Sequence, residues 1–317
     1  MNYWRQILAT KLIMGFNILS RCKKVAEGML LDFIDAHTHI VPVKFYSEDL
    51  LKAVASLMRV DPEFYRSISQ NPDNLIKYMD EHSVKALVIM SYPAPDVMGF
   101  GDEQVDEVAQ YVRGHRDRLL QFGSVNPRLN KNPLPRLEEI YSKYEIRGLK
   151  LHPVHQLVKP NAYRPEEGNM KSLEQIYQFA CDHELPMQIH TGTSMFPRAR
   201  NKFGDPIFLD ELPLDFPKMK IILSHGGRPI WMETAFYLLR RHRQMLFDIS
   251  SIPPHRLLDY FPRFEIVADK AIFGSDWPGP GVQSIHENIQ EFLKLPLSEG
   301  IKRKVLFENA AKLFGIK

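Results

Sequence analysis

Short apolar runs recur along the chain, and segments with helical spacing of apolar residues lie between them. The runs are apolar on both faces, which is typical of parallel strands covered by helices. They span residues 30–37, 84–91, 119–127, 146–153, 185–192, 220–227, 245–250 and 270–278. The helical segments span residues 103–116, 133–144, 170–184, 230–243, 284–295 and 298–316. Ser284 and Ser298 are the predicted N-caps of the last two helices.

This alternation predicts the fold class. Eight strands that alternate with helices indicate an α/β protein with a (β/α)8 barrel of the TIM type. An open, doubly wound sheet alternates in the same way, so the number of strands does not by itself decide between the two. We assign residues 30–317 to a single barrel domain.

Two intervals between the predicted strands are long, residues 41–83 after the first strand and residues 191–219 after the fifth. Both contain helical signals of their own, and we expect them to form cap insertions over one mouth of the barrel. Residues 1–29 form an N-terminal extension that we place outside the core. The extension is basic and weakly amphipathic, so a helix that lies on a membrane surface is the alternative.

Composition and charge narrow the function classes. The 317 residues carry a formal net charge of +3, with no clustered basic stripe of the kind that nucleic-acid binding needs. No run approaches the ~20 apolar residues of a transmembrane helix. The two cysteines, Cys22 and Cys181, exclude a disulfide scaffold and favour a reducing compartment. We therefore expect a cytoplasmic protein.

Ligand-type side chains lie at the carboxyl ends of most predicted strands. In a TIM-type barrel these ends converge on one face, where the active sites of this architecture lie. The side chains are His37 and His39 after the first strand, Lys150 and His152 at the fourth, His190 at the fifth, His225 at the sixth and Asp276 at the eighth. Their repetition at the same end of the strands indicates one common site.

The chemistry of these residues favours a metal site. His37 and His39 are two apart on an extended strand, so they point the same way and can chelate together. His190 and Asp276 complete a ligand set for a divalent ion, most simply zinc, although the same ligands accept manganese or iron. Asp276 can also accept a proton from bound water, and His225 can polarise a carbonyl or shuttle a proton.

Several of these residues have structural alternatives. A histidine at a strand end is often only a hydrogen-bonded polar residue, which is the alternative for His225. An ion pair inside the barrel mouth is the alternative for Lys150. Asp35 is expected to hold a ligand histidine in place. Five histidines that fall on helices or at their ends are expected to face solvent, namely His115, His183, His242, His255 and His286.

The segments "IDAHTHI", "IHTG", "ILSHGG", "IFGSDWP" and "FENAAKLFGI" resemble the amidohydrolase superfamily over residues 30–316. The closer resemblance is to the branch that includes aminocarboxymuconate semialdehyde decarboxylase. It implies a distorted (β/α)8 barrel with a divalent ion at the strand ends and His225 as the catalytic histidine. The implied ligands are His37, His39, His190 and Asp276. In other branches a lysine on the fourth strand is carbamylated and bridges two metals. Whether Lys150 is carbamylated, and whether one or two metals bind, stays open.

Further residues are candidates for binding substrate. The segment "GLKLHP", which also looks like the family, contains Lys150 and His152. Arg228 directly follows "SHGG", where its guanidinium can clamp a substrate carboxylate; a surface position at a helix start is its alternative. Trp277 is expected to form part of the pocket wall. The loop of residues 193–205 carries three basic side chains, which suits a small anionic substrate.

We expect a metal-dependent hydrolase, in which metal-activated water attacks the carbonyl of an ester, lactone or amide in a small carboxylated substrate. The alternative is a metal-dependent, non-oxidative decarboxylase of an unsaturated or aromatic acid, which would use the same ligands. A barrel that has lost catalysis and serves as a binding protein is the third reading, and the complete ligand set argues against it. The oligomeric state is open, although members of this family often form homodimers.

Overall fold

The computed structural model of the protein describes residues 32–40 and 60–317. Residues 33–317 form one compact unit. The predicted N-terminal extension, residues 1–29, lies outside the described residues. Residues 41–59 of the first predicted cap also lie outside them. The boundary that we placed at residue 30 therefore stays a prediction.

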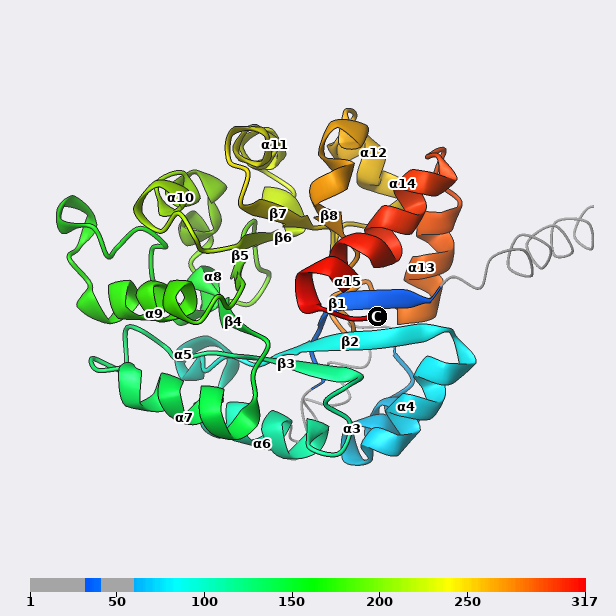
Figure 1. Cartoon of the computed structure of the whole chain (residues 1–317), viewed down its shortest axis with the longest axis horizontal. Coiled ribbons are helices and arrows are strands. Elements are labelled where there is room, and N and C mark those ends of the chain that lie inside the picture. Colours follow the sequence, from blue (N-terminus) through cyan, green and yellow to red (C-terminus); the bar gives the residue numbers. More distant parts are fainter. Residues whose placement is uncertain (1–31, 41–59) are drawn as a thin grey trace, which may run out of the picture. The chain divides into compact units, whose positions relative to one another are not determined.

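The described chain contains one sheet of eight parallel strands, arranged in the order in which they occur in the sequence (Figure 1). The strands are β1 (Phe33–Thr38), β2 (Val84–Met90), β3 (Leu119–Gly123), β4 (Gly148–Leu151), β5 (Met187–His190), β6 (Ile221–Ser224), β7 (Met245–Asp248) and β8 (Ala271–Ile272). All eight predicted strands are present, each shorter than its apolar run. Every strand pairs with its sequence neighbour, as right-handed β–α–β connections around a barrel require.

The sheet closes through backbone contacts between β1 and the segment that follows β8. The Ala36 amide donates to the Phe273 carbonyl at 2.9 Å, and the Asp276 amide donates to the His37 carbonyl at 2.8 Å. An isolated parallel bridge joins Thr38 to Trp277. The eight strands thus form a nearly closed barrel, which confirms the predicted (β/α)8 class over an open, doubly wound sheet.

Helices alternate with the strands and surround them (Figure 1). The longer ones are α3 (Pro62–Gln70), α4 (Pro72–Glu81), α6 (Glu103–Val112), α7 (Leu134–Tyr144), α9 (Lys171–Asp182), α11 (Met232–Arg241) and α13 (Ile285–Leu293). The shorter ones are α5 (Pro95–Met98), α8 (Pro153–Gln156), α10 (Leu212–Asp215), α12 (Leu257–Tyr260), α14 (Glu299–Arg303) and α15 (Asn309–Phe314). No helix of the described residues is both long and apolar enough to cross a membrane.

The sequence signals for helix ends hold at the C-terminus of the chain. The hydroxyl of Ser284 accepts from the Glu287 amide at 3.0 Å, and that of Ser298 accepts from the Ile301 amide at 3.3 Å, so both are N-caps as predicted. The helix expected over residues 298–316 is divided, because a π-helical turn over Lys304–Glu308 separates α14 from α15.

The end of the barrel opposite the polar strand ends is packed with hydrophobic side chains. Ile34, Val88, Phe122, Ile222 and Ile272 pack there with Ala310 and Phe314 of α15. The rings of Phe122 and Phe314 meet edge to face with 5.9 Å between centroids. The C-terminal helix therefore covers this end, which leaves the carboxyl ends of the strands as the polar mouth.

The segments predicted as caps contact residues of that mouth. The rings of Phe64 and Tyr65 in α3 lie 6.3 and 5.7 Å from the Trp277 ring. After β5, the Arg200 amide donates to the Val154 carbonyl in α8 at 3.0 Å. These contacts are compatible with two caps, which remain a prediction for both insertions.

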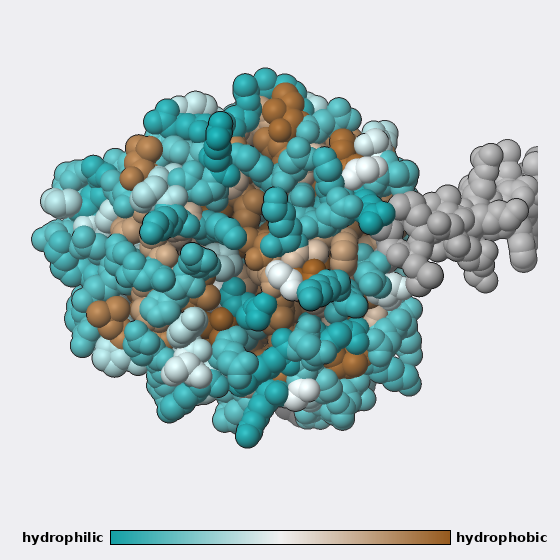
Figure 2. All heavy atoms as spheres, in the orientation of Figure 1, coloured by the Kyte–Doolittle hydropathy of each residue, from teal (hydrophilic) through white to brown (hydrophobic). Residues whose placement is uncertain are grey.

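The outside of the molecule is mainly polar. The face in Figure 2 is covered mostly by hydrophilic residues, with hydrophobic ones between them in small groups.

Of the five helix histidines expected to face solvent, one prediction is wrong. His242 is buried because its Nε2 pairs with the Asp210 carboxylate at 2.7 Å.

We predict that Gly148→Ala destabilises the fold. A Cβ at this position in β4 would lie 2.3 Å from the Phe122 ring, and overpacking of this kind costs about 1–3 kcal/mol. Gly300→Ala is the matched control, because a Cβ there meets nothing within 4 Å and alanine favours the helix. Urea unfolding measures both variants. Equal stability of the two would contradict the close packing of β4 on Phe122.

Candidate metal centre and active site

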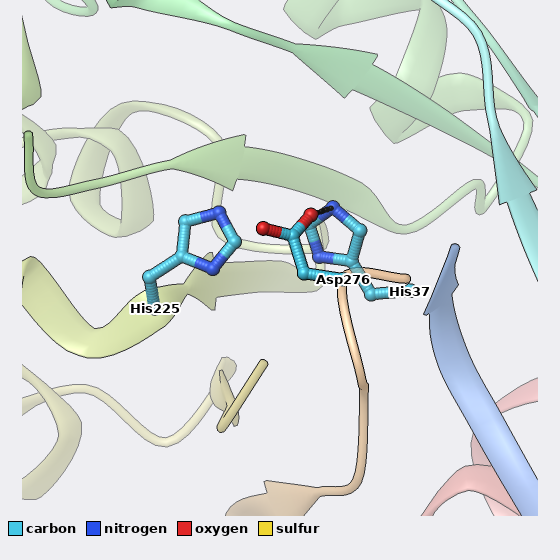
Figure 3. Close-up of side chains that lie close together, drawn as sticks. All are labelled: His37, His225 and Asp276. Atoms are coloured by element: carbon cyan, nitrogen blue, oxygen red, sulfur yellow. Dashed lines mark ion pairs between the residues drawn. The ribbon is translucent and has the colours of Figure 1, made fainter. Parts of the chain in front are cut away.

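The polar strand ends bring three of the predicted site residues into one cluster. His37 is the residue before Thr38, the last residue of β1. His225 begins the turn after β6, and Asp276 follows β8. One ligand atom from each lies within 4.8 Å of the others. Figure 3 shows the Asp276 carboxylate between the two imidazole rings, with all three side chains directed to a common point. Residues separated by up to 239 positions in the sequence thus form one candidate metal centre.

His39 lies beside this cluster. Its Nε2 atom is 3.1 Å from Nε2 of His37 and 3.2 Å from Oδ1 of Asp276. Two imidazole nitrogens and a carboxylate oxygen at these distances fit a shared divalent ion, because each has a lone pair to give. The His-x-His pair therefore points inward together, as the strand spacing requires.

His190 lies at the end of β5. The residue is buried, and among the described residues neither of its ring nitrogens has a hydrogen-bond partner. Its ring lies 4.8 Å from that of His225. Buried polar atoms in folded proteins normally have partners, so an orphaned imidazole in a cluster of ligand-type residues fits coordination of an ion.

Asp248 at the end of β7 orients His37. The Nδ1 atom of His37 donates to Oδ2 of Asp248 at 2.5 Å, which leaves Nε2 with its lone pair towards the cluster. The Ser250 hydroxyl and the Gln188 amide also donate to Oδ2, each at 2.8 Å. We did not select Asp248 from the sequence. It lies near the carboxyl end of the predicted strand "MLFDIS", so the criterion that selected the other strand-end residues would have included it.

Asp35, the residue expected to hold a histidine side chain, acts on the backbone instead. Its Oδ1 atom accepts from the amides of His37 at 3.1 Å and Ser275 at 2.9 Å. It therefore ties β1 to the segment after β8. Burial raises the pKa of Asp35 to about 7 despite these bonds.

The backbone is strained where it presents two of the candidate ligands. His225 has φ of 67° and Asp276 has φ of 65°, in the left-handed region that residues with a Cβ seldom adopt. Gly226 follows His225 with φ of 52°, and a Cβ there would lie 2.6 Å from the Phe261 ring. The "SHGG" motif thus reflects a turn that has no room for side chains directly after the histidine.

Charge and burial keep the ligand-type groups in the forms that bind metal. Burial lowers the pKa of His225 to about 3 and that of His190 well below its usual value, so both rings are neutral at pH 7. Burial raises the pKa of Asp276, but the imidazoles of His225, His39 and His37 outweigh it and hold the pKa well below its usual range. Neutral imidazole and ionised carboxylate are the forms that coordinate a metal.

Two cationic side chains flank the centre. The Nζ atom of buried Lys150 lies 3.4 Å from Nε2 of His37 and 3.4 Å from the Ser224 hydroxyl. Burial lowers the pKa of Lys150 to about 8. The Arg228 guanidinium donates to the Ser251 hydroxyl, while its buried Nε atom has no partner. In the part of the chain that the structure describes, neither cation has a carboxylate within ion-pair distance.

The remaining predicted substrate residues are buried at the same mouth. His152 stacks on His190 with 3.9 Å between ring centroids. Trp277 packs against α3, and its buried indole N–H has no hydrogen-bond acceptor among residues 32–40 and 60–317. A further histidine, His155, stacks on His152 at 3.6 Å. His155 has no signal at a strand end, because it lies within the short helix α8.

The architecture and the site together define a class, the (β/α)8 barrels with a candidate metal centre of histidine and aspartate at the strand ends. The sequence model of the amidohydrolase family matches residues 34–316, and the chain belongs to this family. No curated protein sequence matches the chain.

Solved structures share the fold at low sequence identity. An uncharacterised TIM-barrel protein, Bb4693 from Bordetella bronchiseptica, is 19% identical with a TM-score of 0.70, over 90% of this chain and 99% of that chain. A dihydroxybenzoic acid decarboxylase from Polaromonas sp. JS666, with bound manganese and the inhibitor 2-nitroresorcinol, is 16% identical with a TM-score of 0.59, over 90% and 97%.

A 4-oxalomesaconate hydratase, LigJ from Rhodopseudomonas palustris, is 17% identical with a TM-score of 0.58, over 90% of this chain and 96% of that chain. Other similar structures are decarboxylases of 5-carboxyvanillate and of 2,6-dihydroxybenzoate. At these identities the likeness shows the fold, and the chemistry has to be argued from the site.

We predict that Asp248→Asn lowers the affinity for a divalent metal about 10- to 100-fold, because His37 loses the carboxylate that orients it. Elemental analysis after dialysis against a weak chelator measures the retained metal. Asp210→Asn is the matched control, since it removes the carboxylate partner of a histidine outside the site, His242. Equal metal loss in both variants, or none in either, would contradict the role of Asp248.

Proposed function

We propose that the protein is a metal-dependent, non-oxidative decarboxylase of a small aromatic or unsaturated carboxylic acid. The observation that carries this proposal is the pair of cations, Lys150 and Arg228, that flank the candidate metal centre without an acidic partner among the described residues. An unpaired cation away from water is costly, and an anionic ligand would offset that cost. A carboxylate substrate is such a ligand.

We propose His37, His39, His190 and Asp276 as the metal ligands, with zinc as the first candidate and manganese or iron as alternatives. The bound ion would supply a Lewis acid that orients and polarises oxygen atoms of the substrate. Manganese is the ion in the dihydroxybenzoic acid decarboxylase that shares this fold. The cluster of ligand atoms within 4.8 Å of one another consists of His37, His225 and Asp276, so His225 lies beside two of the proposed ligands.

Decarboxylation requires a proton at the carbon that carries the carboxylate. We propose that water supplies it: the ionised Asp276 carboxylate takes a proton from water in the site, which leaves hydroxide, and passes this proton to the carbon, while His225 lies beside the same point (Figure 3). The carbon gains the proton, its bond to the carboxylate breaks, and the electron pair of that bond stays on the carbon. Carbon dioxide leaves. The Nδ1 atom of His225 lies 3.0 Å from the Ser250 carbonyl oxygen and donates to it, so its Nε2 atom carries no proton and can accept a hydrogen bond from that water.

Hydrolysis of an ester, lactone or amide is the second candidate, and it is the reaction that the residues alone favour. The low pKa of Asp276 supports it, because an ionised carboxylate can take a proton from water and pass it to a leaving group. The similar structures with stated activities include several decarboxylases and one hydratase, which supports decarboxylation at least as strongly.

For the substrate itself we propose contacts with Lys150, His152, Arg228 and Trp277. Arg228 would pair with a carboxylate, and the Trp277 indole N–H has no acceptor in the described part of the chain. A cytoplasmic location and a homodimer remain predictions, supported respectively by the low cysteine content and by the family resemblance.

We predict that the purified, metal-loaded protein releases carbon dioxide from at least one acid in a panel that includes 2,6-dihydroxybenzoate and 5-carboxyvanillate. Removal of the metal should abolish the reaction, and Asp276→Asn should lower kcat at least about 100-fold. A coupled carbon dioxide assay measures the rates. Turnover of esters or lactones without any carbon dioxide release would favour hydrolysis. A protein that binds no divalent ion and gains no activity from added ions would indicate a binding protein.

We predict that Arg228→Met raises the KM for a carboxylated substrate about 10- to 100-fold, since a hydrogen bond to a charged group contributes about 1.5–3 kcal/mol. Lys218→Met is the control, because it removes an exposed positive charge elsewhere on the surface. Steady-state kinetics measures both. An unchanged KM in the Arg228 variant would assign this arginine a structural role through Ser251.

A further inference from the structure

The proton position of His152 follows from a backbone contact. His152 is the N-cap of the four-residue helix α8, and its Nδ1 atom accepts from the His155 amide at 3.3 Å. A backbone amide can only donate, so Nδ1 carries no proton. A ring without a proton on Nδ1 is neutral and has its single proton on Nε2. His152 is therefore a hydrogen-bond donor through Nε2.

The ring of His152 is fixed on both faces. It stacks on His190 on one side, with centroids 3.9 Å apart and planes at 17°, and on His155 at 3.6 Å and 8°. The Tyr92 ring lies 4.8 Å from it. Among the described residues the hydrogen bonds of the His152 ring involve Nδ1 alone, so Nε2 is available to a ligand at the barrel mouth where His190 lies.

His155 is in turn held at both of its nitrogens. Its Nδ1 atom lies 3.0 Å from the Tyr92 hydroxyl, and its Nε2 atom lies 2.7 Å from the Ser194 hydroxyl. Ser194 belongs to the loop after β5, and the Phe196 ring of the same loop meets His155 edge to face at 5.2 Å. The loop therefore contacts the histidine stack at His155.

We propose that His152 donates a hydrogen bond from Nε2 to an oxygen atom of the carboxylated substrate, and that Tyr92, His155 and Ser194 are positioning residues that hold its ring. The substrate class rests on the proposed function. The tautomer of His152 and the arrangement of the stack do not depend on it. In this role His152 binds the anion as a neutral donor and transfers no proton.

Two substitutions at His152 separate a donor from a proton carrier. In His152→Gln the side-chain amide can place an N–H near the position of Nε2, whereas His152→Leu has no donor. We expect the leucine variant to bind 2,6-dihydroxybenzoate about 10- to 100-fold more weakly and the glutamine variant to stay within a few-fold of the wild type. Isothermal titration calorimetry on metal-loaded protein measures binding, and both carbon dioxide release and metal content are checked in each variant.

The outcomes distinguish this proposal from the proposed function. Equal loss of binding in both variants, or binding by the wild type of neither 2,6-dihydroxybenzoate nor 5-carboxyvanillate, would overturn the donor role. Donor-dependent binding without any carbon dioxide release would support the donor and refute decarboxylation. Nitrogen-15 NMR of the histidine side chains provides a test without any ligand, since a protonated Nδ1 on His152 would also overturn the proposal.

The positioning residues have their own test. Tyr92→Phe and Ser194→Ala each remove one hydroxyl from the His155 contacts, and we expect about a 2- to 10-fold weaker affinity for 2,6-dihydroxybenzoate with unchanged metal content and thermal stability. The matched controls, Tyr141→Phe and Ser142→Ala, change hydroxyls on the outer helix α7 and should leave the affinity unchanged. Unchanged affinity in Tyr92→Phe and Ser194→Ala would contradict the positioning role.

Discussion

The backbone hydrogen bonds between β1 and the segment after β8 are the constraint on which the rest of the structure depends. The amide of Asp276 donates to the carbonyl of His37, so the contact that closes the barrel also joins two candidate metal ligands. Asp35 strengthens the contact between β1 and the segment after β8, because it accepts from an amide on each of them. The hydrogen bonds that close the barrel therefore also bring the candidate ligands together, and a change that breaks these bonds would separate the ligands.

The site concentrates groups that a folded protein normally avoids burying. Imidazoles are held neutral, carboxylates are held ionised beside them, and Lys150 is buried without an acidic partner in the described part of the chain. The left-handed backbone at His225 and Asp276 adds strain. The paired strands and the hydrophobic packing of α15 at the other end of the barrel hold this arrangement in place. A bound ion with an anionic ligand would offset much of the free-energy cost of burying these groups.

Sequence periodicity was sufficient for the fold because eight apolar runs and their intervening helices have only a few arrangements in space. Strand-end position selected His37, Lys150, His190, His225 and Asp276, all of which lie at the carboxyl ends of their strands or just after them. The same rule would have included Asp248, which we did not select. It could not reach His155, which lies in a short helix and matters only through its contacts with Tyr92, His152 and Ser194. His242 shows the same limit, since only the fold reveals that Asp210 pairs with it.

The sequence by itself determined the class of fold, the kind of ligand at each strand end and the family, because these follow from local periodicity and from short motifs. Only the tertiary structure decided which atoms point at one another. Examples are the proton on Nε2 of His152, the unpaired nitrogens of His190 and the absence of an ion pair at Lys150 among the described residues. These features depend on distances between residues far apart in the chain, and those distances are fixed only when the barrel closes.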